Sequence, residues 1–283
     1  MTSQMATSEF LRQFDVSGYV ILKGLLDSQA IHAAQEAIGV LVEREAQELI
    51  KAGIISESFR DEPFESRMFR LYEKSLDTAP ASWRPELHLP GLFDVFFCAP
   101  LLDRVEAILG PEIRLYPNYA ARIKLPEQRL VLWHQDGGYT EHWHKVSSGD
   151  VVELQMVNVW APLVPARVEN GCMQFVAGSH KLGLLPHEQR EYYLKIPEEH
   201  IAPHAERIID IELDPGDVVV FQNMLCHRNV PNRTQTVRWS LDWRYQLASQ
   251  STLRAEKGYI ARSRKEPETA VHSASEWGRL SFC

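Results

Sequence analysis

The sequence predicts an α+β fold in which helices pack against an antiparallel β-sheet. In the first third of the chain, apolar residues recur at helical spacing. From Ile113 onward, runs of β-branched and aromatic residues are separated by turn sequences, which is typical of antiparallel strands. We therefore expect one domain with a helical part over about 1–112, a β-core over about 113–246 and a C-terminal tail over 247–283.

The helical part opens with a short apolar strand over 18–24. Asp27 or Ser28 then offers a helix N-cap, because their side-chain oxygens can accept from the first free N–H groups. The apolar spacing that follows predicts an amphipathic helix that ends at Gly53. We expect mostly irregular structure with a short helix over 54–90, and one or two helices over 92–109.

The β-core is predicted from alternating or continuous apolar runs between turns. The turns include 169–171 and 214–217, and the polar stretch between 177 and 206 is expected to lie on the surface. The expected strands are 113–125, 129–135, 151–162, 172–177, 207–213, 217–222 and 236–246.

Composition excludes several classes of protein. The chain has 283 residues, of which 45% are hydrophobic, as in ordinary globular proteins. Its 30 Lys and Arg against 38 Asp and Glu give a net charge of −8, which argues against a nucleic-acid or anionic-membrane partner. The longest uncharged run is too short for a membrane span. Neither a secretory leader nor a CxxC spacing is seen, so we expect a reduced, cytoplasmic protein.

The densest chemical signal is His134-Gln135-Asp136. On an extended strand the first and third residues point the same way, so an imidazole and a carboxylate can meet one metal ion. His227, at the far end of the strand predicted over 217–222, offers a second imidazole. Two histidines and one carboxylate are typical of non-haem Fe(II) oxygenases, but zinc hydrolases use similar ligands. The alternative is a surface hydrogen-bonded pair and a structural histidine.

The strand predicted over 236–246 alternates between aromatic or aliphatic residues and polar ones. If its polar face lines a barrel, Arg238 is buried there and needs an anion, for which a carboxylate is the natural partner. Ser240 can donate one more hydrogen bond. For Asp242 and Arg244, which share that face, we expect exposure to solvent.

The order of these motifs resembles the phytanoyl-CoA dioxygenase-like family of Fe(II)- and 2-oxoglutarate-dependent oxygenases. The resemblance covers roughly 10–246 and includes the opening strand and the stretches 169–172, 178–181 and 214–217. It implies a double-stranded β-helix (jelly-roll, cupin-like) core. It also implies Fe(II), with 2-oxoglutarate and O2 as co-substrates, and a hydroxylation that releases succinate and CO2.

The resemblance also implies roles for single residues. His134, Asp136 and His227 are the expected iron ligands. Arg238 is expected to pair with the distal carboxylate of 2-oxoglutarate.

The remaining roles are less direct. Ser240 is expected to assist Arg238, and Trp160 to lie near the cofactor. Because the carboxylate ligand Asp136 is present, oxygen transfer is expected rather than halogenation. His180, within the family-like 178–181, is interpreted as structural.

The substrate is expected to be a small molecule, either a carboxylated metabolite or a natural-product intermediate. Arg122 suits an anionic group of that substrate, and Tyr139 and Trp143 can form the walls of its pocket. The 192–193 segment and the tail can cover the pocket or form a homodimer contact. Two other classes remain open, a zinc or manganese hydrolase on a cupin-like barrel and a non-catalytic small-molecule binding protein.

Overall fold

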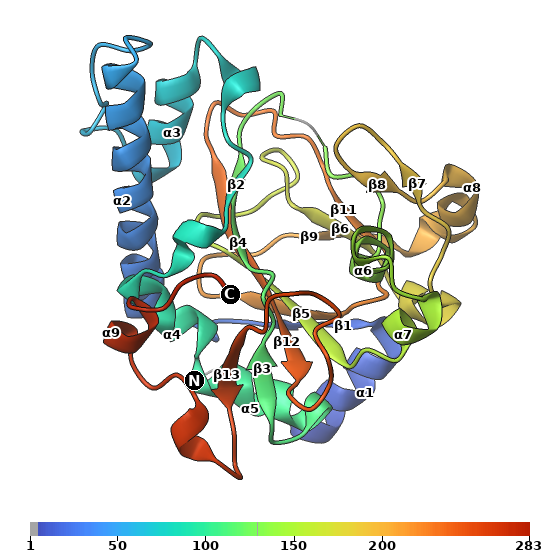
Figure 1. Cartoon of the computed structure of the whole chain (residues 1–283). Coiled ribbons are helices and arrows are strands. Elements are labelled where there is room, and N and C mark those ends of the chain that lie inside the picture. The colour runs from blue at the N-terminus through green and yellow to red at the C-terminus, as the bar shows by residue number, and fades with distance from the viewer. Residues whose placement is uncertain (1–4, 129) are drawn as a thin grey trace.

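The computed structural model of the chain describes residues 5–128 and 130–283. Figure 1 shows helices packed around antiparallel strands, with the long α2 on one side of the molecule. The α-helices are α1 (Thr7–Ser17), α2 (Ser28–Lys51), α3 (Phe64–Tyr72), α4 (Phe93–Phe96), α5 (Ala99–Leu109), α6 (Asp136–His144), α7 (Ser148–Val152), α8 (Glu198–Ile201) and α9 (Ala274–Trp277). Among the described residues, no helix is both long and apolar enough to cross a membrane.

The strands form two main antiparallel sheets and a small hairpin. The strands are β1 (Tyr19–Leu22), β2 (Ser82–Trp83), β3 (Ile113–Leu115), β4 (Ala120–Lys124), β5 (Met156–Pro162), β6 (Met173–Val176), β7 (Glu188–Gln189), β8 (Leu194–Lys195), β9 (Ile208–Ile211), β10 (Val218–Gln222), β11 (His227–Asn229), β12 (Arg238–Leu247) and β13 (Tyr259–Arg262). The larger sheet has the order β1-β10-β5-β12-β3-β13, and β4 joins it by pairing with β12 and β2. The smaller sheet has the order β11-β6-β9, and β7 pairs with β8. The predicted α+β class is confirmed.

The helical part follows the sequence pattern closely. The predicted opening strand is β1, which pairs with β10. Asp27 caps α2 by accepting a hydrogen bond of 2.7 Å from the Ala30 N–H. The apolar face of α2 enters the main core, because residues such as Ile31 and Ile38 are buried there.

The β-core differs from the prediction in three places. The strand expected over 113–125 is divided into β3 and β4, because Pro117 cannot donate to a ladder and lies between them. The strand expected over 151–162 begins as α7, which Ser147 caps, and only β5 is extended. Within 130–135 the only pairing is one isolated bridge at His134, while residue 129 lies outside the described residues.

The strand β12 lies at the centre of the larger sheet and is covered on both faces. Its apolar face packs under the helical part, where Trp239 stacks on Phe64 with ring centroids 5.3 Å apart. Its polar face, from Arg238 to Gln246, is also buried. This face lies toward the interior of the fold, so polar side chains there are held away from bulk water.

The tail belongs to the folded core. Its strand β13 extends the larger sheet by pairing with β3. Trp277 is buried and stacks on His88, with ring centroids 4.0 Å apart. Arg254 is the tail residue that reaches the central cavity. The assignment of the whole chain to one domain and the homodimer contact stay predictions.

The predicted turn at 214–217 supplies a stability prediction. Asp217 accepts hydrogen bonds from the Gly24 N–H (2.9 Å), the Asp214 N–H (3.0 Å) and the Lys23 ammonium (2.7 Å). Burial alone would raise the pKa of Asp217, but these donors lower it below its usual value. Its stabilising contribution is therefore present above the unfolded pKa and is lost as the pH falls through the lower folded pKa.

We expect Asp217→Asn to lower the free energy of unfolding by about 1–3 kcal/mol at pH 7, because a charged acceptor is lost. Urea unfolding at pH 7 and pH 3 measures the effect, and the difference between variant and wild type should shrink at the lower pH. An equal difference at both values would contradict an ionised Asp217.

Candidate metal centre

Two backbone hydrogen bonds hold His134 and His227 side by side. The His134 N–H donates to the His227 carbonyl at 3.0 Å, and the His227 N–H donates to the His134 carbonyl at 2.9 Å. His227 begins β11, while Asp136 is the first residue of α6. The sequence pattern predicts this carboxylate on a strand, but it lies at the start of a helix. Because the backbone of Gln135 is still extended, the side chains of His134 and Asp136 point the same way, as expected.

The three side chains converge on one point. The Nδ1 atoms of His134 and His227 lie 2.7 Å and 2.8 Å from the carbonyl oxygens of Leu132 and Leu225. A neutral ring that donates through Nδ1 leaves Nε2 as a lone-pair donor. These Nε2 atoms lie 3.7 Å and 3.9 Å from Asp136 Oδ1, and all three ligand atoms lie within 4.8 Å of one another.

The electrostatics of the cluster suit a divalent cation. Burial, together with the nearby His134, lowers the pKa of His227 to about 3, so its imidazole is neutral. Burial alone would raise the pKa of Asp136, but the Arg244 guanidinium and the two imidazoles hold it well below its usual range. Two neutral imidazoles and one carboxylate leave several coordination positions for other ligands.

Arg244 orients the carboxylate, and the expectation that it faces solvent is wrong. Its Nη2 and Nε donate to Asp136 Oδ2 at 2.7 Å and 3.0 Å, which directs Oδ1 toward the histidines. Asp242, also expected in solvent, is buried and accepts from Arg244 at 2.8 Å. The physical reason is that β12 is covered on both faces, so its polar side chains pair with each other.

A second support for the cluster comes from the segments that follow β6 and β10. The Gln135 amide bonds to the carbonyls of Gly183 and Met224, both at 2.7 Å. The Gln135 N–H donates to His187 Nε2 at 3.1 Å, and a Cβ at Gly138 would lie 2.4 Å from the His187 ring. Sequence reasoning missed this support, although the Gly137-Gly138 pair directly after Asp136 was a signal of close packing.

Arg238 is a buried guanidinium, as predicted. It is 2% exposed, its Nε donates to the Gly171 carbonyl at 3.1 Å, and its Nη1 donates to the Ser240 hydroxyl. Its guanidinium carbon lies 5.6 Å from the centroid of the Trp160 ring. Burial lowers the pKa of Arg238 to about 10, and within the described part of the chain no carboxylate forms an ion pair with it.

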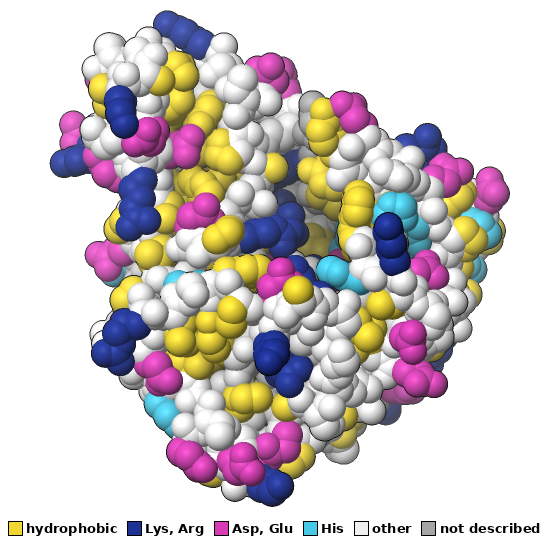
Figure 2. Space-filling view, viewed as in Figure 1, with side chains coloured by type: hydrophobic (Ala, Val, Ile, Leu, Met, Phe, Trp, Pro, Cys, Tyr) yellow, Lys and Arg dark blue, Asp and Glu magenta, His cyan; other side chains and the backbone are white. Residues whose placement is uncertain are grey.

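A central cavity joins these groups. It has a volume of about 460 Å³, which suits small molecules, and both the triad and Arg238 line it. Its described lining residues include six arginines and Lys124, but only two carboxylates, Asp136 and Asp242. Figure 2 shows Lys and Arg side chains inside the hollow on this face. The cavity is therefore basic in a protein whose net charge is −8.

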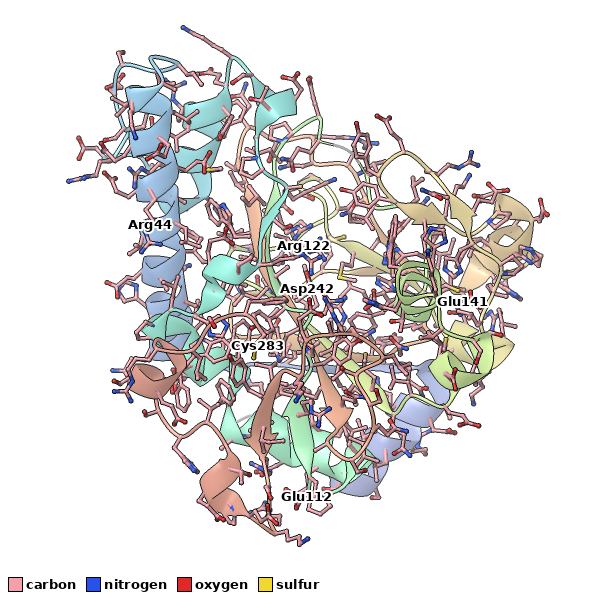
Figure 3. The ribbon with its side chains drawn as sticks, in the orientation of Figure 1. Arg44, Glu112, Arg122, Glu141, Asp242 and Cys283 are labelled. Atoms are coloured by element: carbon pink, nitrogen blue, oxygen red, sulfur yellow. The ribbon has the colours of Figure 1, made fainter. Side chains whose placement is uncertain are left out.

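The three predicted substrate residues all line this cavity. Tyr139 packs edge-on against His134, and its hydroxyl accepts from the Leu194 N–H at 3.2 Å. Trp143 is 53% exposed and lies at the cavity mouth. Arg122 forms a hydrogen-bonded ion pair with Asp242, and Figure 3 places these two side chains together at the centre of the fold.

The remaining histidine of interest lies apart from the cluster. His180 Nε2 lies 2.9 Å from the Asp15 carbonyl, and its ring packs against Gly18. Gly18 has φ +81° and ends α1. His180 therefore joins the N-terminal helix to the core, which agrees with its interpretation as a structural residue.

We expect Arg244→Gln to weaken divalent-metal binding about 10- to 100-fold, because an unheld carboxylate is a poorer ligand. Cobalt(II) titration followed by visible absorption measures the affinity. Arg262→Gln is the matched control, since Arg262 also bridges two carboxylates, Asp103 and Glu106, but lies outside the cavity lining. Equal metal affinities of the two variants would contradict the positioning role of Arg244.

Comparison with known proteins identifies the family. The model of the phytanoyl-CoA dioxygenase family matches residues 14–240. The chain is 26% identical over 290 residues to 1-deoxypentalenic acid 11-beta-hydroxylase of Streptomyces exfoliatus, covering 92% of each chain. The corresponding enzyme of Streptomyces arenae is 26% identical over 289 residues, again covering 92% of each chain.

Solved structures show the same fold. EctD from S. alaskensis, in complex with 2-oxoglutarate and 5-hydroxyectoine, superposes with a TM-score of 0.62 at 19% identity, over 99% of this chain and 87% of that one. The epimerase SnoN with Fe3+, alpha ketoglutarate and nogalamycin RO gives 0.56 at 18% identity, over 87% and 86%. The double-stranded β-helix core is thereby confirmed.

The buried His-Asp-His triad agrees with the family match. The chain belongs to the phytanoyl-CoA dioxygenase family and is an Fe(II)- and 2-oxoglutarate-dependent dioxygenase that acts on small molecules.

Proposed function

We propose that His134, Asp136 and His227 hold the iron. The observation that carries this is the convergence of their ligand atoms within 4.8 Å at the wall of a basic cavity. The donor set fits the metal, because both imidazoles are oriented through Nδ1 and present Nε2. Arg244 occupies the other oxygen of Asp136, which leaves one oxygen for the metal.

Arg238 is the proposed anchor for the distal carboxylate of 2-oxoglutarate. A buried guanidinium without an ion-pair partner is costly, and a bound dicarboxylate would supply the missing charge. Ser240, which accepts from Arg238, fixes the guanidinium and can donate its own proton to the same carboxylate. Trp160 lies against the guanidinium and forms an adjacent wall.

The proposed reaction is hydroxylation of an unactivated C–H bond of the substrate. When bound, iron and 2-oxoglutarate supply the oxidising chemistry with O2, which yields succinate and CO2. The protein itself positions the target carbon and excludes water. Tyr139, held between His134 and the backbone of Leu194, forms a rigid wall beside the triad. Trp143, on α6, also lines the cavity and is half exposed.

The proposed substrate is a small carboxylated metabolite or natural-product intermediate. The excess of cationic side chains in the lining supports an anionic group. Two relatives that cover 92% of the chain are named for hydroxylating 1-deoxypentalenic acid, a carboxylic acid. Arg122, which forms an ion pair with Asp242, is one of these cationic side chains. The volume of about 460 Å³ favours a small acid over a coenzyme A thioester.

The test is 2-oxoglutarate turnover by the purified protein with Fe(II), O2 and a panel of terpenoid and other carboxylic acids. We expect succinate to form in an iron- and oxygen-dependent reaction, and a matching acid to raise its rate and to gain one oxygen atom by mass spectrometry. A protein that neither binds 2-oxoglutarate by calorimetry nor forms succinate would overturn the proposal.

A further inference from the structure

Arg84 is one of three cavity arginines, with Arg228 and Arg238, for which the described residues supply no ion-pair partner. It follows β2, whose Ser82 and Trp83 pair with Arg122 and Ala121 of β4. This pairing places Arg84 at the cavity wall. Its guanidinium donates to the Asn118 side-chain oxygen. Within the described residues, no carboxylate lies within ion-pair distance of it.

The neighbouring arginines are all neutralised. Arg122 and Arg244 share Asp242, and Arg244 also binds Asp136. Arg254 donates to Glu256 at 2.8 Å. Arg84 is largely buried and lies near these three cations, so burial and the cations together lower its pKa to about 10, although the nearby Asp242 acts in the opposite direction. One positive charge of this cluster is therefore left without an internal counterion.

Arg228, like Arg238, forms no ion pair with any described residue, but its surroundings differ from those of Arg84. Its guanidinium stacks on the Trp133 ring at 4.5 Å and donates to the Gln174 side chain at 2.8 Å. The carboxylates Glu198 and Asp210 are close enough to raise its pKa. Arg228 thus has an aromatic stacking partner, whereas the Asn118 side-chain oxygen is the described partner of the Arg84 guanidinium; acids act on both, since Asp242 also raises the pKa of Arg84.

The position of Arg84 differs from that of the proposed co-substrate anchor. Arg238 opens β12, whereas Arg84 directly follows Trp83, which pairs with Ala121 and through it with Leu241, three residues further along the strand. Three residues of extended strand span roughly 10 Å. A ligand held by Arg84 therefore need not displace one held by Arg238. Arg244 joins Asn118 to Asp136, so the Arg84 site also adjoins the proposed metal centre.

We propose that Arg84 binds the carboxylate of the organic substrate and selects acids over their neutral derivatives. The inference rests on the proposed function and assigns the anchoring role to Arg84, whereas Arg122 is already neutralised by Asp242. A guanidinium has five N–H donors in a planar fork, and the Asn118 side-chain oxygen accepts from one of its nitrogens. A single uncompensated charge matches one carboxylate better than a doubly charged phosphate monoester.

The test compares acids with their methyl esters. A panel of monocarboxylic acids of about ten to twenty carbons, 1-deoxypentalenic acid among them, is titrated by calorimetry under anaerobic conditions. Each acid and its ester are titrated into the protein with Fe(II), with and without saturating 2-oxoglutarate. We expect at least one acid to bind about 10- to 100-fold more tightly than its ester, the range for a charged hydrogen-bonded pair. That preference should persist with 2-oxoglutarate bound.

Three variants assign the preference to one residue. Arg84→Gln should reduce the acid-to-ester ratio to near one while leaving ester and 2-oxoglutarate affinities unchanged, and Arg84→Lys should restore part of it. Arg228→Gln, the matched control, should keep the wild-type ratio. Melting temperatures check that each variant is folded.

The contrary outcomes are equally defined. If no acid binds, if acids and esters bind alike, or if Arg228→Gln removes the preference and Arg84→Gln does not, the inference is overturned. Failure of the oxygenase assignment is seen separately, as absent 2-oxoglutarate binding and absent succinate, because the acid titrations need no turnover.

Discussion

Replacing His227 by alanine is expected to abolish iron retention and 2-oxoglutarate turnover. The imidazole is buried, neutral and oriented by the Leu225 carbonyl, and among the described residues only His134 and Asp136 share its ligand cluster. Loss of a residue that hydrogen-bonds to a metal ligand typically weakens metal binding 10- to 100-fold. Loss of the ligand itself should cost more than about 100-fold. Iron content after desalting and succinate formation measure the two effects.

His32→Ala is the control for this substitution. His32 lies on the exposed face of α2, with 72% of its side chain exposed, and pairs with Glu36. It should retain wild-type iron content and turnover. A His227→Ala protein that is folded by circular dichroism and still binds one equivalent of iron would show that the triad is not the metal site.

Replacing Arg238 by alanine is expected to weaken 2-oxoglutarate binding by about 30-fold or more. Truncating one partner of a buried charge pair costs about 2 kcal/mol or more, because the other charge is left unpaired. Without 2-oxoglutarate the guanidinium itself is the unpaired charge, and burial lowers its pKa to about 10. The ligand-free variant should therefore lose little stability. 2-Oxoglutarate should raise the melting temperature of the wild type but not of the variant.

Two further variants make this result specific. Arg238→Lys keeps the charge but not the planar fork, so we expect intermediate affinity. Arg84→Gln removes a different cavity arginine and should leave 2-oxoglutarate binding unchanged. Equal thermal stabilisation of wild type and Arg238→Ala by 2-oxoglutarate would show that the distal carboxylate binds elsewhere.

The residues that carry chemistry could be predicted from local patterns. The two histidines and Asp136 stand out because only a few residue types bind metal ions, and their side chains must point toward one place. Arg238 was found from alternation along a single strand, since period-two spacing places it opposite the aromatic residues of β12. The Asp27 cap of α2 is equally local, because Asp27 accepts a hydrogen bond from the Ala30 N–H, only three residues further along the chain.

The errors occurred where a residue's neighbours come from distant segments. Alternation in β12 showed that Asp242 and Arg244 share a face with Arg238, but not whether water or protein covers that face. Likewise, Arg84 lies in a stretch expected to be irregular, and only the pairing of β2 with β4 brings it to the cavity.

The sequence by itself determined the fold class, the metal-binding chemistry and the need of Arg238 for an anion, because each depends on residue type and short-range periodicity. Only the tertiary structure decided which charges are neutralised: Asp136 by Arg244, Asp242 by Arg122, and Arg84 by no described carboxylate. Charge pairing depends on distances of a few ångströms between segments far apart in the chain, and no local pattern encodes those distances.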